Sequence, residues 1–227
     1  MADNEIFDDP EKLKRGFIKV LECVATISSA AAVVNPIFGV AGSLIRVVLH
    51  HVDDEDLQIL KREFRSVNRA LDDISQQNRQ TLQQIRKETI DKQYGQIEEN
   101  IRNQFRKFME IVEAKPGHLQ RKKDDFVESY MNDNEDQNMH TLWDGVMGKR
   151  KLFSRPILEV YMKHSEGDQT VMENLCTRLA YLFCIGFIAM MGYYAFIEDD
   201  VEARNEEWEE KMKNVQEKMQ EALRGCK

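Results

Sequence analysis

Two adjacent histidines followed by an acidic segment are the residues best placed for chemistry in this chain. His50 and His51 precede residues 52–56 (VDDED), and imidazole and carboxylate groups are common ligands of metal ions. No second group of ligands completes a tetrahedral set, so we predict no metal site. Because the imidazole pKa is about 6.5, His50 and His51 are candidates for a pH switch instead. The segment is also typical of one helix ending before the next is capped.

Other residue types that perform catalysis lack suitable neighbours. Residues 145–149 (GVMGK) resemble a phosphate-binding loop, but its spacing and the preceding strand are missing, so we expect a turn. His118, His140 and His164 have no nucleophile at a useful spacing and are interpreted as surface or interface residues. Without a catalytic set, we predict that the protein is not an enzyme and binds no cofactor.

Charge excludes one class of partner and suggests another. The net charge of −8 argues against a general nucleic-acid binder, because affinity for nucleic-acid phosphates needs a positive surface. Residues 198–224 hold ten acidic and five basic residues, so much of the negative charge lies at this end. Lys149, Arg150, Lys151 and Arg155 form a small basic cluster. This cluster is a candidate contact for anionic lipid head groups, with a solvated surface as the alternative.

Two long stretches of the chain carry no charge. Cys23–Ile45 and Leu179–Ile197 contain no Asp, Glu, Lys or Arg, although 32% of all residues are charged. Each is about as long as a helix that crosses a hydrocarbon layer of roughly 30 Å. Such segments need cover from the protein's own core, from a partner or from a membrane. In the second stretch, small residues would allow close helix contacts. Its candidate residues are Leu182, Phe183, Ile185, Gly186, Phe187, Ala189 and Gly192.

The first uncharged stretch predicts an apolar helical hairpin. A helix begins at residues 9–11 (DPE), and Asn35-Pro36 ends it because the residue before proline avoids the helical conformation. A second apolar helix continues to residue 52, which leaves NPIFG at the tip. That tip is apolar where a surface loop is normally polar, so the hairpin is a candidate for membrane contact. The candidate residues are Val33, Val34, Asn35, Pro36, Ile37, Phe38, Val40 and Leu44.

Two longer segments show apolar residues spaced three and four apart, the pattern of a coiled-coil seam. Residues 53–114 predict one long helix, in which the apolar frame changes phase near Glu88 and Gly95 is a candidate bend. Residues 115–167 predict short helices and loops. Residues 168–225 predict a second long helix that is capped by Asp168 and begins with the second uncharged stretch. We expect these two helices to pair as an antiparallel, coiled-coil-like stalk.

Together these segments predict an elongated all-α bundle in a single domain, with an N-terminal helix and the apolar hairpin over residues 9–52. The composition favours helix, with only four prolines, and no segment alternates apolar and polar residues as a strand would. The acidic start is not typical of a secretory signal, and the four cysteines lack metal or disulfide spacing. We therefore expect a cytoplasmic protein with reduced thiols, which associates with membranes if its apolar segments insert.

Several phrases together resemble the rapunzel family, which is known mainly from fish. They are GFIKVLECVATISSAAAVVNPIFGVAGSLI, NRQTLQQIRKETID, WDGVMGKRKLFSRPILEVYMKH and YLFCIGFIAMMGYYAFIEDD with EKMQEAL. The match covers nearly the whole chain, and NPIFG and FSRPILEVY are its most specific parts. The resemblance implies a non-enzymatic protein linked to growth and innate-immune regulation. It implies no catalytic or cofactor residues.

Two main hypotheses for function follow, and an integral membrane protein is a third. An apolar hairpin, heptad helices and the lack of an enzyme motif are similar in architecture to α-helical pore-forming proteins. The first hypothesis is therefore a membrane-active protein, soluble at rest, whose hairpin inserts in or docks on membranes before homo-oligomerisation. The second is a cytosolic interaction or regulatory protein, which binds partner proteins through its heptad faces and keeps its apolar segments buried.

Overall fold

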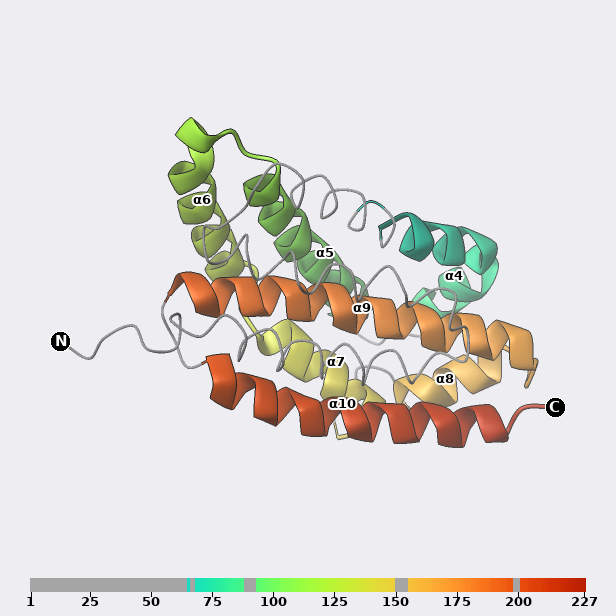
Figure 1. The fold of residues 1–227 in the computed structure, drawn as a ribbon. Coiled ribbons are helices and arrows are strands. Elements are labelled where there is room, and N and C mark those ends of the chain that lie inside the picture. The colour runs from blue at the N-terminus through green and yellow to red at the C-terminus, as the bar shows by residue number, and fades with distance from the viewer. Residues whose placement is uncertain (1–64, 66–67, 88–92, 150–154, 198–200) are drawn as a thin grey trace.

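The computed structural model describes residues 65, 68–87, 93–149, 155–197 and 201–227, and most of these residues lie in helices (Figure 1). The all-α prediction is confirmed. The elements are α4 (Arg79–Lys87), α5 (Gln93–Val112), a 3-10 turn (Pro116–His118), α6 (Leu119–Asn132), α7 (Gln137–Met147), α8 (Ile157–His164), α9 (Gln169–Phe196) and α10 (Val201–Arg224).

Helix α9 is the central element. In Figure 1 it crosses the molecule between α5 and α10, and α5, α6, α8 and α10 all pack against it. Every residue from Leu175 to Tyr194 is buried. A helix that is apolar on all sides needs such cover on all sides, because any exposed face would leave apolar surface in water.

The C-terminal segment is two helices, which corrects the prediction of one long helix over residues 168–225. Helix α9 ends at Phe196 and α10 begins at Val201. The rings of Phe187 and Trp208 lie 5.0 Å apart, whereas 21 residues of straight helix would separate them by about 30 Å. The two helices therefore form an antiparallel hairpin. Folding back buries the apolar stripe of α10, which consists of Trp208, Met212, Val215 and Met219.

Residues 53–114 also differ from the single long helix predicted for them. Asn78 lies in a turn, α4 ends at Lys87 and α5 begins at Gln93. Arg102 Nη1 lies 3.3 Å from Asp72 Oδ1, although a straight helix of that length would span about 45 Å. The chain therefore folds back between Asp72 and Arg102.

Helix α5 runs in the same direction as α9, so these two do not form the predicted antiparallel stalk. The Glu98 end of α5 contacts Arg178, and further along both helices Phe108 lies near Phe196. The antiparallel pair is α9 with α10. The predicted cap of α9 is confirmed, since Asp168 Oδ1 accepts a hydrogen bond from the backbone N–H of Val171 at 2.8 Å.

Two glycines of α9 allow neighbouring side chains to approach its backbone. A Cβ atom at Gly186 would overlap the Sδ atom of Met139 on α7. A Cβ atom at Gly192 would overlap the ring of Phe108 on α5. Both glycines belong to the second apolar segment, and both serve contacts within this chain.

We expect Gly192→Ala to lower the free energy of unfolding by about 1–3 kcal/mol, because the buried Phe108 ring must move. Urea unfolding followed by circular dichroism measures this change. The matched control is Gly95→Ala in α5, where an added Cβ meets no atom within 4 Å. The control should leave stability unchanged or raise it by up to about 1 kcal/mol, because alanine favours helix over glycine. Equal effects of the two substitutions would contradict the close contact at Gly192.

Candidate functional site: helix α9 and its polar contacts

The second apolar segment is the candidate functional element that the structure describes. Among the described residues, α9 is the helix whose length and composition would allow it to cross a membrane, because an 18-residue window within Gln169–Tyr194 has a mean hydropathy of 1.7. That apolar window is completely buried. Core helices of soluble proteins share this composition, so composition alone does not assign a membrane role. All candidate residues of the segment, from Leu182 to Gly192, lie inside the bundle.

A buried arginine lies directly before the charge-free run. The Arg178 side chain is 1% exposed, and its Nη2 atom donates to Glu98 Oε1 on α5. Its Nε atom donates to Ser75 Oγ at 2.9 Å. Glu98 also accepts from Arg102 Nε at 3.2 Å, and Arg86 Nη2 of α4 lies 3.7 Å from its other oxygen. These polar contacts join α9 to α5, to α4 and to the helical segment before α4.

The electrostatics of this cluster keep both members of the buried pair charged. Burial alone would raise the pKa of Glu98, but Arg178, with help from Arg102 and Arg86, outweighs burial and holds that pKa below 4.5. Burial would lower the pKa of Arg178, and the neighbouring Tyr94 and Glu98 more than compensate. The cluster therefore holds a fixed ion pair, and separating that pair would leave a charge in the core.

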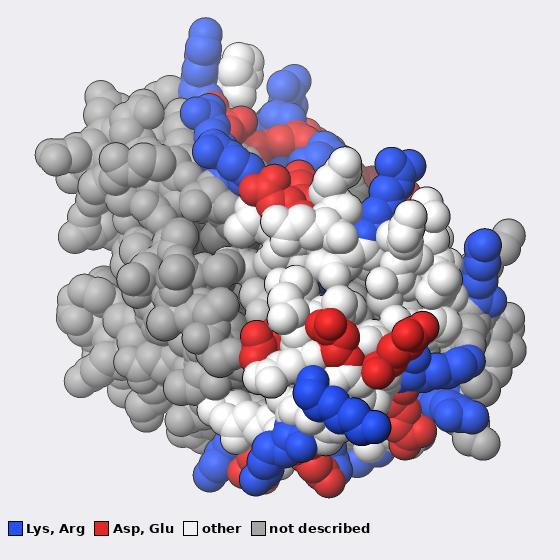
Figure 2. Space-filling model, turned by 90° about the vertical axis from the view of Figure 1, so that its right-hand side faces the viewer, with Lys and Arg blue, Asp and Glu red and all other residues white. Residues whose placement is uncertain are grey.

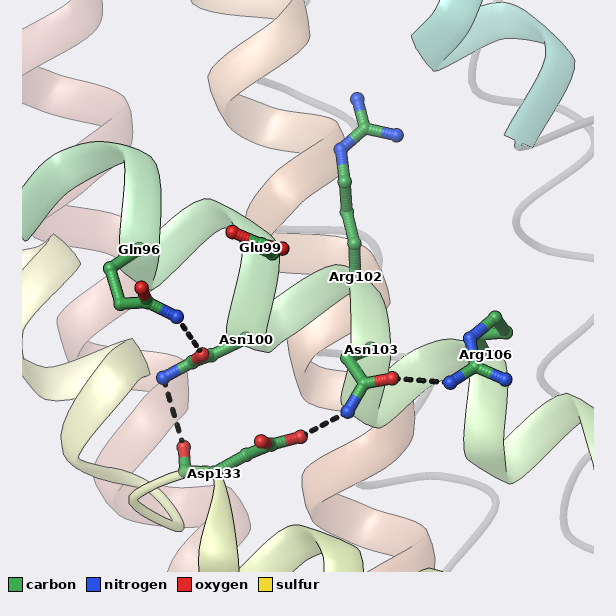
Figure 3. Close-up of a pocket in the computed structure, with 7 residues that line it drawn as sticks. All are labelled: Gln96, Glu99, Asn100, Arg102, Asn103, Arg106 and Asp133. Atoms are coloured by element: carbon green, nitrogen blue, oxygen red, sulfur yellow. Dashed lines mark hydrogen bonds between the residues drawn. The ribbon is translucent and has the colours of Figure 1, made fainter.

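An amide cluster on α5 holds the tight turn between α6 and α7. Asn134 and Glu135 in this turn have φ angles of 66° and 48°, which side-chain-bearing residues rarely adopt. Asn100 Nδ2 donates to the backbone oxygen of Asp133 at 3.3 Å, and Asn103 donates to the Asp133 carboxylate (Figure 3). Gln104 Nε2 donates to the backbone oxygen of Glu135 at 3.1 Å. The turn places Asp136 toward the far end of α9.

Two tyrosines at the end of the apolar run find polar partners there. Tyr194 donates its hydroxyl to Asp136 Oδ2, and Tyr130 donates to Asp136 Oδ1 at 2.7 Å. The Tyr193 ring stacks on Tyr130 with centroids 4.3 Å apart. The guanidinium of Arg204 lies 5.0 Å above the Tyr194 ring. The apolar run of α9 is thus bordered by polar contacts at both ends.

A cluster around His140 links α7 to α10 and was not found from the sequence. His140 Nδ1 lies 3.0 Å from Lys211 Nζ, and its ring packs on Trp208 at 4.9 Å. Lys211 Nζ also lies 2.5 Å from Glu207 and close to the faces of Trp143 and Trp208. Partial burial, and then Lys211, lower the pKa of His140 below 6.5, against the opposing effects of Glu207, Asp136 and Asp144. The sequence offered no signal, because 71 residues separate His140 from Lys211.

The remaining predicted site residues lie outside the described part or on the surface. The hairpin residues 33–44, the proposed switch at His50 and His51, and the basic residues Arg150 and Lys151 lie outside the described residues. Lys149 and Arg155 are exposed, and Lys149 Nζ lies 4.2 Å above the Trp143 ring. On the face drawn in Figure 2, Lys and Arg side chains (blue) lie interspersed with Asp and Glu side chains (red). Within the described residues, no group of three or more His, Cys, Asp or Glu could hold a metal ion.

The fold and this site define a class: an all-α bundle built around one fully buried apolar helix with polar contacts at its ends. Residues 51–227 match the family described as "Cephalotoxin-like middle helical domain". The whole chain is 83% identical over 227 residues to "Protein rapunzel" of Danio rerio, covering 100% of both sequences. The chain belongs to the rapunzel family and carries this helical domain, which confirms the resemblance seen in its sequence. No solved structure matches it.

The buried ion pair leads to a first expectation. Glu98→Leu should lower the free energy of unfolding by about 3–5 kcal/mol, because Arg178 is left charged in the core. The double variant Glu98→Leu with Arg178→Met should recover most of that loss, since no unpaired charge remains. Urea unfolding at neutral pH measures both. The control Glu110→Gln removes partly exposed pairs with Lys122, Arg106 and Lys107 and should cost at most about 1 kcal/mol. If Glu98→Leu lost no more unfolding free energy than Glu110→Gln, that result would contradict the structural role of the pair.

The second expectation concerns mildly acidic solution. The His140 pKa is lower in the folded than in the unfolded chain, so protons bind preferentially to the unfolded chain as the pH falls below about 6.5. The folded state should therefore lose stability between neutral pH and about pH 5.5. His140→Gln, which keeps an acceptor for Lys211 but does not titrate, should flatten this dependence in urea unfolding. An unchanged pH profile would show that His140 does not contribute.

Proposed function

We propose that this rapunzel-family protein is a non-enzymatic, membrane-active protein that keeps a membrane-spanning helix in its core. In the soluble form α9 is covered by the rest of the bundle, and at a membrane it leaves these partners and enters the lipid. The apolar hairpin of residues 23–52 would insert or dock with it. One observation carries this proposal: α9 has the length and composition of a span, and its apolar window is completely buried.

The positions of the polar contacts of α9 support the proposal that the bundle holds this helix until it reaches a membrane. Its charge-free run begins directly after Arg178 and ends near Tyr193 and Tyr194, so the polar contacts lie at the two ends. Tyrosines suit the interface between lipid and water, and an arginine at a helix end can extend its charge to the same interface. Release of α9 would break few polar contacts within the run itself. The family description "Cephalotoxin-like" fits a membrane-active protein and lends further support.

A second candidate function is a regulatory protein that acts through protein partners. The same complete burial of α9 favours it, because a helix with full cover inside one chain needs no other environment. Under this alternative, the surfaces of α5 and α10 would contact partner helices, and the protein would not bind lipid membranes. The resemblance to rapunzel proteins of growth and innate-immune regulation fits it. The two candidates differ in whether α9 ever leaves the bundle.

A reversible cross-link between α9 and α7 tests the proposal. A Cβ atom at position 186 would lie 3.3 Å from the Cγ atom of Met139, so cysteines at both positions come within disulfide reach. We expect reduced Met139→Cys/Gly186→Cys to release dye from anionic vesicles and the oxidised form to lose this activity. Reductant should restore it. Met139→Cys alone, oxidised in the same way, is the control for the native cysteines.

The outcomes separate the two candidates. Circular dichroism of the oxidised variant must match the wild type, so that lost activity reflects the cross-link. Dye release by the cross-linked form would contradict the exit of α9. Absence of wild-type flotation with anionic vesicles, at neutral pH and at about pH 5.5, would contradict membrane activity and favour the regulatory alternative.

A further inference from the structure

A cavity of about 460 Å³ lies beside the start of the charge-free run of α9. Its walls come from α4, α5, α9 and the helical segment before α4. The chemical groups that face it belong to Ser75, Arg86, Glu98, Glu99, Arg102 and Arg178. A cavity of this volume accommodates a small molecule.

The inner wall of the cavity carries an excess of positive charge. Three guanidinium groups, from Arg86, Arg102 and Arg178, surround the single carboxylate of Glu98. Glu99 also lines the cavity, so its lining carries three positive and two negative groups. Figure 3 shows that the Arg102 guanidinium points away from Asn103 and Asp133, and its ion-pair partners are Glu98 and Asp72.

Two buried polar atoms at this cavity have no hydrogen-bond partner among the described residues. They are a donor, Arg178 Nη1, and an acceptor, Glu98 Oε2. The two side chains are only 1% and 6% exposed. Buried charged groups normally satisfy their hydrogen-bonding capacity, because an unmade hydrogen bond is costly there. A matching ligand must therefore accept from a guanidinium and also donate to a carboxylate.

We propose that this cavity binds a phosphate group that retains one proton. Its charged oxygens accept from Arg178 Nη1 and from Arg86, and its P–OH group donates to Glu98 Oε2. Guanidinium groups suit phosphate oxygens in geometry and charge. Sulfate has the same shape and the same double charge as hydrogenphosphate, but it has no proton to donate. Glu98 therefore makes the site selective for phosphate over sulfate.

The ligand would bridge α4, α5 and α9, so binding should stabilise the folded chain whether or not the protein acts on membranes. We expect the midpoint temperature of thermal unfolding to be about 2–4 °C higher in about 20 mM phosphate than in the same concentration of sulfate at equal ionic strength. Arg86→Gln should abolish this difference. Arg86 is 55% exposed, so its replacement should not unfold the protein.

Arg106→Gln is the matched control, because Arg106 is 59% exposed on α5 and does not line this cavity. It should keep the full phosphate effect. Equal stabilisation by sulfate would overturn the role of Glu98. A phosphate effect that survives Arg86→Gln, or that disappears in Arg106→Gln, would overturn the assignment of the cavity.

The phosphate group can belong to a soluble compound or to a lipid head group, and flotation distinguishes them. Vesicles containing phosphatidylinositol 4-phosphate are compared with vesicles of unphosphorylated phosphatidylinositol. Binding to the first alone, lost in Arg86→Gln, would identify a lipid source. Stabilisation by inorganic phosphate without such flotation would identify a soluble source. Neither stabilisation nor flotation would overturn the proposal.

Discussion

The structure depends on one constraint: α9 is apolar on every side, so every side must be covered. The residues from Leu175 to Tyr194 are all buried, and α5, α6, α8 and α10 supply much of the cover. Each large apolar side chain in this run gains about 1.5–3 kcal/mol from leaving water. This burial explains why α10 folds back along α9 and why glycines at 186 and 192 admit Met139 and Phe108. A helix that the bundle covers so completely is apolar on all sides, and this composition also suits the hydrocarbon interior of a lipid bilayer.

Polar contacts at the two ends of the run make this burial specific. Arg178 with Glu98 fixes where α9 meets α5, and Tyr194 with Asp136 fixes where it meets the α6–α7 turn. Buried charges add little net stability, but separating them is costly, so they set alignment more than strength. The His140–Lys211 contact adds an element that weakens when the pH falls. Together these contacts suit a bundle that is stable in solution. A small number of polar interactions at the ends of α9 set the alignment of its apolar core.

The sequence predicted which faces are apolar but not where the helices end. The stripe of Trp208, Met212, Val215 and Met219 and the cap at Asp168 were found from local spacing, because both depend on neighbouring residues. The turns after Phe196 and at Asn78 were missed, since heptad spacing describes a face and continues across a fold-back. The contact between Glu98 and Arg178 could not be predicted directly from the sequence, because 80 residues separate them. A signal existed, because Glu98 shares the apolar face of Tyr94 and Ile101, where a charge needs a buried partner.

The central claim is that α9 is stored in the bundle and leaves it at a membrane. Hydrogen–deuterium exchange of the full-length protein, with and without anionic vesicles, tests it without any substitution. We expect the amides of α9 to stay protected, because a helix keeps its hydrogen bonds in lipid. Those of α5 and α10 should exchange faster, because they lose the helix that covers them. Unchanged protection of α5 and α10 in vesicle-bound protein would contradict the account, and the intact bundle would then be the active form.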